Sequence, residues 1–313
     1  MRAHAAFSGG ALFVLALALL AATSGINEYF FFAGFVVLQF VVLATAWNIL
    51  GGYAGYVNFG SAAFVGAGAY TAVLLFKSLH APLLVQLLAA ATVGAILGFA
   101  TGLLTLRLRG IFFSIATVAI IVIMETVVVN WRYVGGATGV QLLQPPAPFP
   151  FASYTRMLFV LMSALAVLAV TIARYVQGSR IGRGLRAIRD SEEAAEGCGV
   201  PTLNLKLFTC TVSGALMSAA GAPLPMYLSF VEPASSFSLN YSVSALAMAM
   251  IGGTAHWIGP VAGALLLGSV QQAVTVTVSS EINVLVVGVL LVLFVVGAPE
   301  GIIGLLRKRA KHR

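Results

Sequence analysis

Apolar runs about as long as a membrane is thick recur along this chain, and short polar stretches separate them. Hydrophobic residues make up 60% of the 313 positions and charged residues only 8%, whereas a soluble domain carries about 25% charged residues. A helix needs about 20 apolar residues to cross the hydrocarbon core. The sequence therefore predicts an all-α integral membrane protein whose residues 1–313 form a single transmembrane domain.

The runs predict a polytopic helical bundle of about 8–10 transmembrane helices. The expected spans are residues 11–22, 30–50, 51–76, 83–106, 111–129, 157–176, 203–224, 241–251, 260–279 and 283–296. The first run also resembles a cleavable signal peptide, but a signal anchor is favoured because further spans follow it directly. The Gly-rich stretches 51–60 and 252–260 have a second interpretation, as breaks inside helices.

The distribution of positive charge predicts the orientation. With ten alternating spans, one side of the membrane holds 14 of the 17 Lys and Arg residues and the other side holds Lys77, Arg132 and Arg156. Cytoplasmic loops carry the excess of Lys and Arg, so both termini and the loop 178–202 are predicted to be cytoplasmic. The net charge of +8 is then explained by loops beside anionic lipid, and no nucleic-acid partner is expected.

Residues 178–201 form the most strongly polar segment, with four of the nine acidic residues and four of the basic ones. A charge costs about 2.5–3.5 kcal/mol at the centre of a span, so this segment must lie in water. Arg186 and Asp190, and Arg189 and Glu193, are each four residues apart, which favours one helix. One interpretation is a solvated loop that fixes the topology; the other is a short helix presented to a cytosolic partner.

The Gly-rich stretch 51–70 also has two interpretations. Glycine lets membrane helices approach closely, which is ordinary packing, but non-helical backbone at membrane depth is tolerated where it lines a cavity. The pattern of Gly51, Gly52 and Ala54 recurs at Gly252, Gly253 and Ala255, and such a repeat is one sign of internal duplication. The candidate substrate-pathway residues in the two stretches are Gly52, Gly55, Asn58, Gly60, Ser61, Gly252, Gly253 and Thr254.

Glu125 is the acidic residue placed most plainly inside an expected span. An intramembrane carboxylate is a functional candidate by default, so Glu125 joins the pathway residues. It lies only five residues before Asn130, and the other interpretation places it at the outer interface. Motifs of nucleotide-hydrolysing loops, catalytic triads and metal sites are absent from the sequence, so no catalytic residue, bound metal or bound cofactor is expected.

Six motifs in the same order resemble one known family along most of the chain. They are GYAGYVNFGSAAFVGAGAY (52–70), RLRGIFFSIAT (107–117), GGATGV (135–140), GRGLRAIRDSEEAAEGCGV (182–200), GALMSAAGAPLPMYLSFVEPASS (214–236) and MIGGTAHWIGPVAGALLL (250–267). The chain is similar to the branched-chain amino-acid permease subunits of ABC importers, of the LivH/LivM type. The length of its charged loop and outer loop resembles the LivM-like branch.

The resemblance implies a permease subunit, not an enzyme, in a bacterial inner membrane. Residues 178–202 would then contain the coupling helix that docks on an ATP-binding subunit, and the complex would contain two such separate subunits, which bind ATP and Mg²⁺. The implied contact residues are Gly182, Arg183, Arg186, Arg189, Asp190, Glu193, Ala194 and Ala195. A second, LivH-like permease and a periplasmic substrate-binding protein are the other implied partners, and transport would proceed by alternating access.

Departures from the family pattern fall on the expected pathway. Family members often have His at the position of Ser61 and a Gln-Leu-Ser type run at Tyr56, Val57 and Asn58. The implied substrates are therefore branched-chain amino acids or similar small amphipathic solutes such as urea and short amides. Two alternatives remain: an ion-coupled secondary transporter that uses Glu125, and a membrane scaffold without transport activity.

Overall fold

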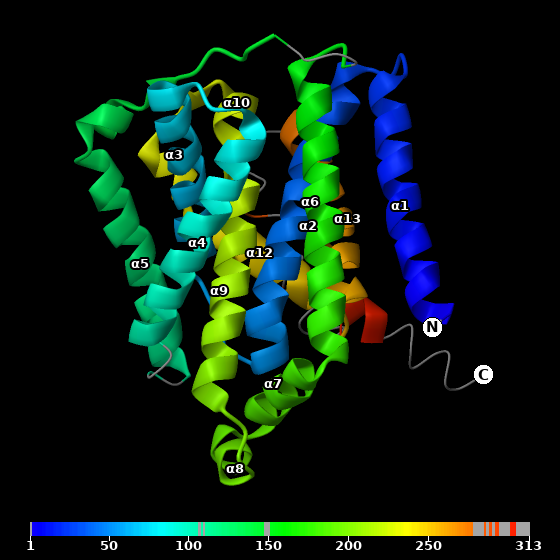
Figure 1. The fold of residues 1–313 in the computed structure, drawn as a ribbon, viewed down its shortest axis with the longest axis vertical. Coiled ribbons are helices and arrows are strands. Elements are labelled where there is room, and N and C mark those ends of the chain that lie inside the picture. The colour runs from blue at the N-terminus through cyan, green and yellow to red at the C-terminus, as the bar shows by residue number, and fades with distance from the viewer. Residues whose placement is uncertain are drawn as a thin grey trace.

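The computed structural model describes residues 2–105, 108, 110–146, 151–277 and 301–304, and isolated positions between 285 and 293. Long helices run up and down through the molecule, and short helices close its two ends (Figure 1). The long helices are α1 (Arg2–Thr23), α2 (Glu28–Ala54), α3 (Ser61–Leu79), α4 (Leu83–Thr105), α5 (Ile111–Val129), α6 (Tyr154–Gly178), α9 (Thr202–Gly221), α12 (Leu239–Gly252) and α13 (Ile258–Thr277).

Seven helices of the described part are long and apolar enough to cross a membrane: α2, α3, α4, α5, α6, α9 with its extension to Leu228, and α13. The apolar part of α1 spans Phe7–Thr23, and α12 has 14 residues. These nine helices correspond to the first nine expected spans. The expected span 283–296 lies outside the continuously described residues. The prediction of a polytopic helical membrane protein is confirmed.

Both Gly-rich stretches are breaks between helices. The helix α2 ends at Ala54, with Gly55 in the left-handed region at φ 79°, and residues 55–59 are not helical before α3 begins. A similar gap follows Gly252, where α12 ends, and α13 starts at Ile258. Each stretch therefore joins two separate helices and is not a break inside one helix, and the expected span 51–76 is wrong at its start, because residues 51–54 belong to α2 and α3 begins at Ser61.

Small residues let α4 pack closely against α9. A Cβ atom at Gly94 would lie 2.4 Å from the carbonyl oxygen of Gly214, and one at Gly98 would lie 2.6 Å from that of Cys210. The hydroxyl of Ser218 donates to the Ala90 carbonyl at 2.7 Å across the same interface. Lipid is as apolar as the helix surfaces, so no hydrophobic effect drives membrane helices together. Close van der Waals packing of this kind stabilises their association instead.

A compact cap covers one end of the bundle. It contains the 3-10 turns η1 (Arg132–Val134) and η2 (Gly136–Thr138), the short helices α10 (Leu224–Leu228) and α11 (Pro233–Ser236), and the strands β1 (Val140–Gln141) and β2 (Phe230–Val231). The strands pair antiparallel with Val140 opposite Val231. Arg156 bonds Glu28 at 2.7 Å and the carbonyls of Ala22, Ser24 and Ile26.

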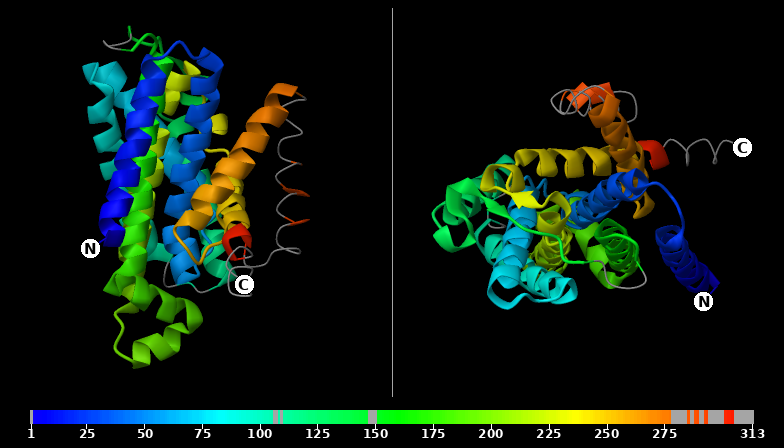
Figure 2. Two further views of the ribbon diagram at one scale, coloured as in Figure 1. Left: turned by 90° about the vertical axis from the view of Figure 1, so that its right-hand side faces the viewer. Right: turned by 90° about the horizontal axis from the view of Figure 1, so that it is seen from above.

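The opposite end carries α7 (Arg180–Asp190) and α8 (Glu192–Gly197), which protrude below the long helices in Figure 1. The N-terminal end of α1 lies on this same side, whereas the C-terminal residues beyond 304 lie outside the described part. Figure 2 shows α1 at the edge of the bundle and α13 inclined against its neighbours. The polar segment 178–201 is therefore held outside the apolar layer, as its charges require.

Candidate functional site

Two serines divide the polar segment into two short helices. Ser179 accepts a hydrogen bond from the Gly182 amide and begins α7, and Ser191 accepts one from the Ala194 amide and begins α8. Ser191 has extended backbone, with φ −162° and ψ 112°. The prediction of one continuous helix face is therefore wrong: Arg189 and Glu193 lie on different helices, because a capping serine interrupts the turn between them.

The eight predicted contact residues fall into a buried group and an exposed group. Gly182 and Ala195 are buried, and a Cβ atom at Gly182 would lie 2.3 Å from the Val176 carbonyl. The small size of Gly182 therefore lets α7 pack closely against the end of α6. The other six are exposed, namely Arg183, Arg186, Arg189, Asp190, Glu193 and Ala194. Of these, Arg183 and Asp190 lie opposite the buried Leu185 and Ile188 on the helical turn.

Arg189 connects α7 to the end of α2. Its Nη1 donates to the Gly52 carbonyl at 2.9 Å. A Cβ atom at Gly55 would lie 3.1 Å from Cγ of Arg189, so the arginine stem packs on the left-handed turn that ends α2. One predicted coupling residue and two predicted pathway residues, Gly52 and Gly55, are thus in direct contact.

Glu192 makes a second connection, to α9 and to the segment after α2. Its Oε1 accepts from Nζ of Lys206 at 2.5 Å, and its Oε2 accepts from the Tyr56 hydroxyl. Lys206 also donates to the Tyr56 hydroxyl at 3.2 Å and is only 3% exposed. A buried ion pair of this kind is sensitive to the loss of either partner.

Sequence reasoning missed this cluster. In the sequence, Lys206 stands out only as one of the positive charges on the predicted cytoplasmic side, and Tyr56 only as a departure from the family pattern. The available signal was a single lysine in the first two turns of an apolar run, ten to fourteen residues after a group of glutamates. A charge in that position needs a partner near the membrane surface.

The segment between α2 and α3 is held by side chains from other helices. Trp47 donates from Nε1 to the Asn58 carbonyl at 2.7 Å, and the Phe59 amide donates to the Thr117 hydroxyl on α5 at 3.1 Å. Asn58 accepts from the Gly60 amide through Oδ1 at 2.7 Å. The predicted pathway residue Asn58 therefore fixes the local backbone at the start of α3.

The two Gly-Gly stretches meet in space. A Cβ atom at Gly52 would lie 3.1 Å from Cβ of Thr254. Gly252 packs at the crossing of α12 with α13, where a Cβ atom would lie 1.7 Å from the Gly259 carbonyl. Gly253 has φ 104°, in the region that favours glycine, and ends α12. The structure thus brings together one predicted residue of each stretch, Gly52 and Thr254, and this close approach is a packing contact.

Buried polar side chains of α2 and of the first residue of α3 lie in the core of the bundle. The hydroxyl oxygens of Thr45 and Ser61 have no hydrogen-bond partner within the described part, and Thr45, Asn48 and Ser61 are all 0% exposed. The Asn48 amide faces the Gly52 backbone. Thr45 and Asn48 were missed because they lie in an otherwise apolar run.

Glu125 does not join this group. It is half-buried on α5, four residues before the helix ends at Val129. Thr117, which contacts the segment after α2, is eight residues away along the same helix, or about 12 Å. The structure places Glu125 toward the capped end, away from Gly52 and Asn58.

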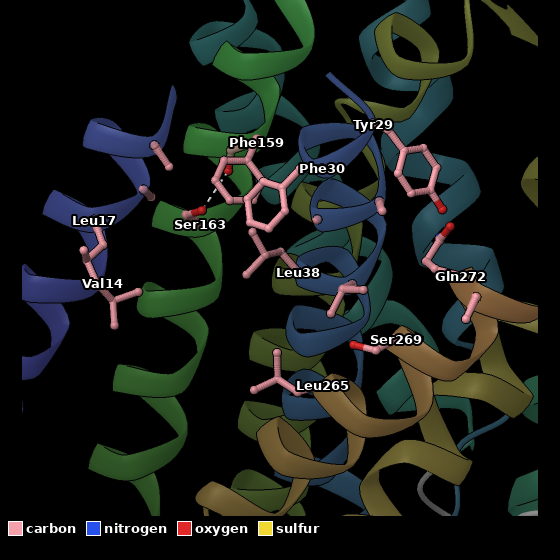
Figure 3. Close-up of a pocket in the computed structure, with 16 residues that line it drawn as sticks. Val14, Leu17, Tyr29, Phe30, Leu38, Phe159, Ser163, Leu265, Ser269 and Gln272 are labelled. Carbon is pink, nitrogen blue, oxygen red and sulfur yellow. Dashed lines mark hydrogen bonds between the residues drawn. The ribbon is translucent and has the colours of Figure 1, made fainter. Parts of the chain in front are cut away.

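A large apolar pocket lies apart from all of the predicted residues. It has a volume of about 720 Å³ and is bounded by α1, α2, α6 and α13 (Figure 3). Val14, Leu17, Phe30 and Leu265 line it, and the Ser163 hydroxyl donates to the Phe159 carbonyl of its own helix. Its apolar walls suit hydrocarbon better than a zwitterion.

Within the described part, no cluster of three or more metal-ligating side chains is present.

Known proteins match most of the chain. Residues 29–295 match the family described as branched-chain amino acid transport system / permease component. The high-affinity branched-chain amino acid permease proteins LivM of Salmonella typhimurium and Escherichia coli are each 26% identical over 297 residues, which cover 87% of this chain and 69% of theirs.

A probable branched-chain amino acid permease protein LivH of Methanocaldococcus jannaschii is 26% identical over 271 residues, or 82% of this chain and 85% of its own. No solved structure matches. The matched residues contain α2 to α13, with both breaks and the α7–α8 segment. The resemblance seen in the sequence is confirmed, and the protein belongs to the permease-component family of branched-chain amino acid transport systems.

Proposed function

We propose that this chain is a membrane-spanning permease subunit of an ABC importer, and that it moves branched-chain amino acids or similar small amphipathic solutes inward. Two separate ATP-binding subunits, which carry ATP and Mg²⁺, drive alternating access from the cytoplasmic side of a bacterial inner membrane. A second, LivH-like permease completes the pathway, and a periplasmic binding protein delivers the solute. Family membership and the relatives' printed activities support this proposal.

One observation carries the mechanism: the α7–α8 segment is bonded to the same helix break that holds the candidate pathway residues. Arg189 bonds Gly52 and Glu192 bonds Tyr56 and Lys206. A displacement of α7 and α8 is therefore transmitted to the α2–α3 break without a change in the helices themselves. Such an element, moved by an outside partner, is what a rigid-body switch requires.

The exposed residues are the docking face in this proposal. Arg183 and Asp190 on α7, and Glu193 and Ala194 on α8, point away from the bundle or into solvent. Arg189 and Glu192 transmit the movement inward. The two groups have different roles: the first group binds the ATPase and the second group couples its closure to the pathway.

Reconstitution of the complete complex tests the proposal. Uptake into vesicles should require ATP and the ATP-binding subunits, and Arg183→Ala with Asp190→Ala should weaken ATPase association and uptake together. Glu125→Gln is the control, because the proposal gives Glu125 no coupling role. Uptake that proceeds without ATP, follows an ion gradient and fails in Glu125→Gln would identify a secondary transporter instead.

A further inference from the structure

A second pocket, of about 570 Å³, lies where α6 meets α7, on the side of the bundle that is predicted to be cytoplasmic. Figure 1 shows the N-terminal end of α1 and the lower end of α6 on this side. Arg174, Arg186 and His256 line the pocket, and none of the described residues that line it is acidic. Its volume is in the range of small-molecule sites, about 300–1,000 Å³, and its charge favours an anion.

Aromatic rings fix the position of one guanidinium group in this pocket. The Cζ atom of Arg174 lies 4.1 Å from the ring centre of Phe7 and 5.6 Å from that of Trp257. The two rings are themselves in edge contact, with centroids 5.4 Å apart. Both distances are within the range of cation–π contacts, and a guanidinium group has five N–H donors in a fixed fork that matches the geometry of an oxyanion.

The walls of the pocket are tied together by Gln177. Its Nε2 donates to the Ala255 carbonyl at 2.8 Å, and its Oε1 accepts from the Trp257 amide at 3.1 Å. These bonds hold the link between α12 and α13 against α6. They therefore fix the position of His256, in that link, relative to Arg174 on α6. Arg186 reaches the same pocket from α7, after the extended residue Ser179.

The geometry points to a binding site for the phosphate of an anionic phospholipid of the cytoplasmic leaflet. Guanidinium groups bind phosphate through charge-assisted, paired hydrogen bonds. The pocket opens at the end of a membrane-spanning helix, beside Tyr175 and Trp257, and such aromatic residues mark the lipid headgroup level. Basic pockets between transmembrane helices on the cytoplasmic side are suited to anionic headgroups.

A bound phosphate would connect α6 and the α12–α13 link to α7. Its oxygens would bridge Arg174 on α6 and Arg186 on α7, across the junction at Ser179. The lipid would therefore hold α7 in place beside the break after α12. Any effect on coupling rests on the proposed function, but the binding itself does not.

Native mass spectrometry of the purified permease, without its ATPase partners, tests the binding. We expect the wild-type protein to retain phosphatidylglycerol over phosphatidylcholine, and Arg186→Ala and Arg174→Lys each to lower that retention about tenfold. Arg183→Ala is the matched control, because it removes the same charge from the same helix but does not line the pocket. It should retain the lipid as the wild type does.

Three results would overturn the inference. Equal retention of the two lipids by the wild type would show that the pocket does not select an anion. Equal loss in Arg183→Ala would show a general effect of net charge. Displacement of phosphatidylglycerol by millimolar inorganic phosphate would show a site for the free ion and not for a lipid. Because uptake is not measured, failure of the importer proposal would leave this result unchanged.

Discussion

At the scale of single residues, the Lys206 ammonium group is the central feature. It is the one charge on α9, it is almost completely buried, and it meets Glu192 and Tyr56 from two other parts of the chain. Taking two charges out of water is costly, and only good geometry and further hydrogen bonds offset that cost. The Tyr56 hydroxyl, which contacts both ions, supplies such bonds.

Replacing Lys206 by Met should therefore destabilise the protein more than its loss of contact area suggests. Glu192 would remain in a mostly buried site without its cation, and we expect a loss of about 3 kcal/mol. Adding Glu192→Gln should recover most of that loss, because no unpaired charge is left. Thermal unfolding in detergent measures both variants.

The control for this pair of variants is Lys77→Met, at an exposed lysine whose Nζ bonds the Tyr133 carbonyl near the other end of the bundle. It should change the unfolding temperature little. A double variant no more stable than Lys206→Met alone would show that the single loss comes from packing and not from the orphaned charge.

At the scale of elements, the sequence predicted most of the helices but not what joins them, and the expected span 51–76 began ten residues before α3. Runs such as 83–106 and 111–129 predicted α4 and α5 to within a residue or two, because hydropathy and length decide membrane helices. The bonds from Arg189 to Gly52 and from Glu192 to Tyr56 join residues more than 130 positions apart. No local pattern contains such pairs.

The division of α7 and α8 into docking and transmitting residues predicts two distinct defects. Arg183→Ala should weaken association with the ATP-binding subunits by several fold. Arg189→Ala should leave association unchanged, because its bond is to Gly52 within this chain. The periplasmic binding protein with its solute bound should then no longer stimulate ATP hydrolysis by the complex that contains Arg189→Ala.

Pull-down of the ATP-binding subunits and ATPase assays on the same complexes measure the two defects. Arg180→Ala is a control for charge, since Arg180 is the exposed first residue of α7. Equal loss of association in Arg183→Ala and Arg189→Ala would contradict the division of roles, because both side chains would then belong to the surface that binds the ATP-binding subunit.

The α4–α9 interface makes a separate prediction. Gly94→Val and Gly98→Val should each destabilise the protein by about 2–3 kcal/mol, because the added carbons meet backbone carbonyls at 2.4 and 2.6 Å. Gly10→Val on α1 is the matched control, since nothing lies within 4 Å of a Cβ atom there. Thermal unfolding in detergent again gives the measurement, and equal effects at all three sites would show that helix–helix contact is not the cause.

At the scale of the whole molecule, both proposals depend on which side of the membrane α7 and α8 face. The bundle places them at the opposite end from α10 of the cap (Figure 1), so a membrane around the long helices would separate the two ends. The excess of Lys and Arg predicts that the α7–α8 end is cytoplasmic. ATP-binding subunits and the anionic lipid of the inner leaflet are both reached only from that side.

The two native cysteines allow this orientation to be measured. Cys198, just after α8, is exposed, and Cys210, within α9, is buried. A membrane-impermeant maleimide should therefore label one thiol in inside-out vesicles that contain the permease alone, and none in intact spheroplasts. Cys198→Ser should abolish the labelling, and Lys77→Cys in that background should be labelled in spheroplasts. Labelling of Cys198 from outside would place α7 and α8 in the periplasm, where neither a cytoplasmic ATPase nor an inner-leaflet lipid could reach them, and both proposals would fail together.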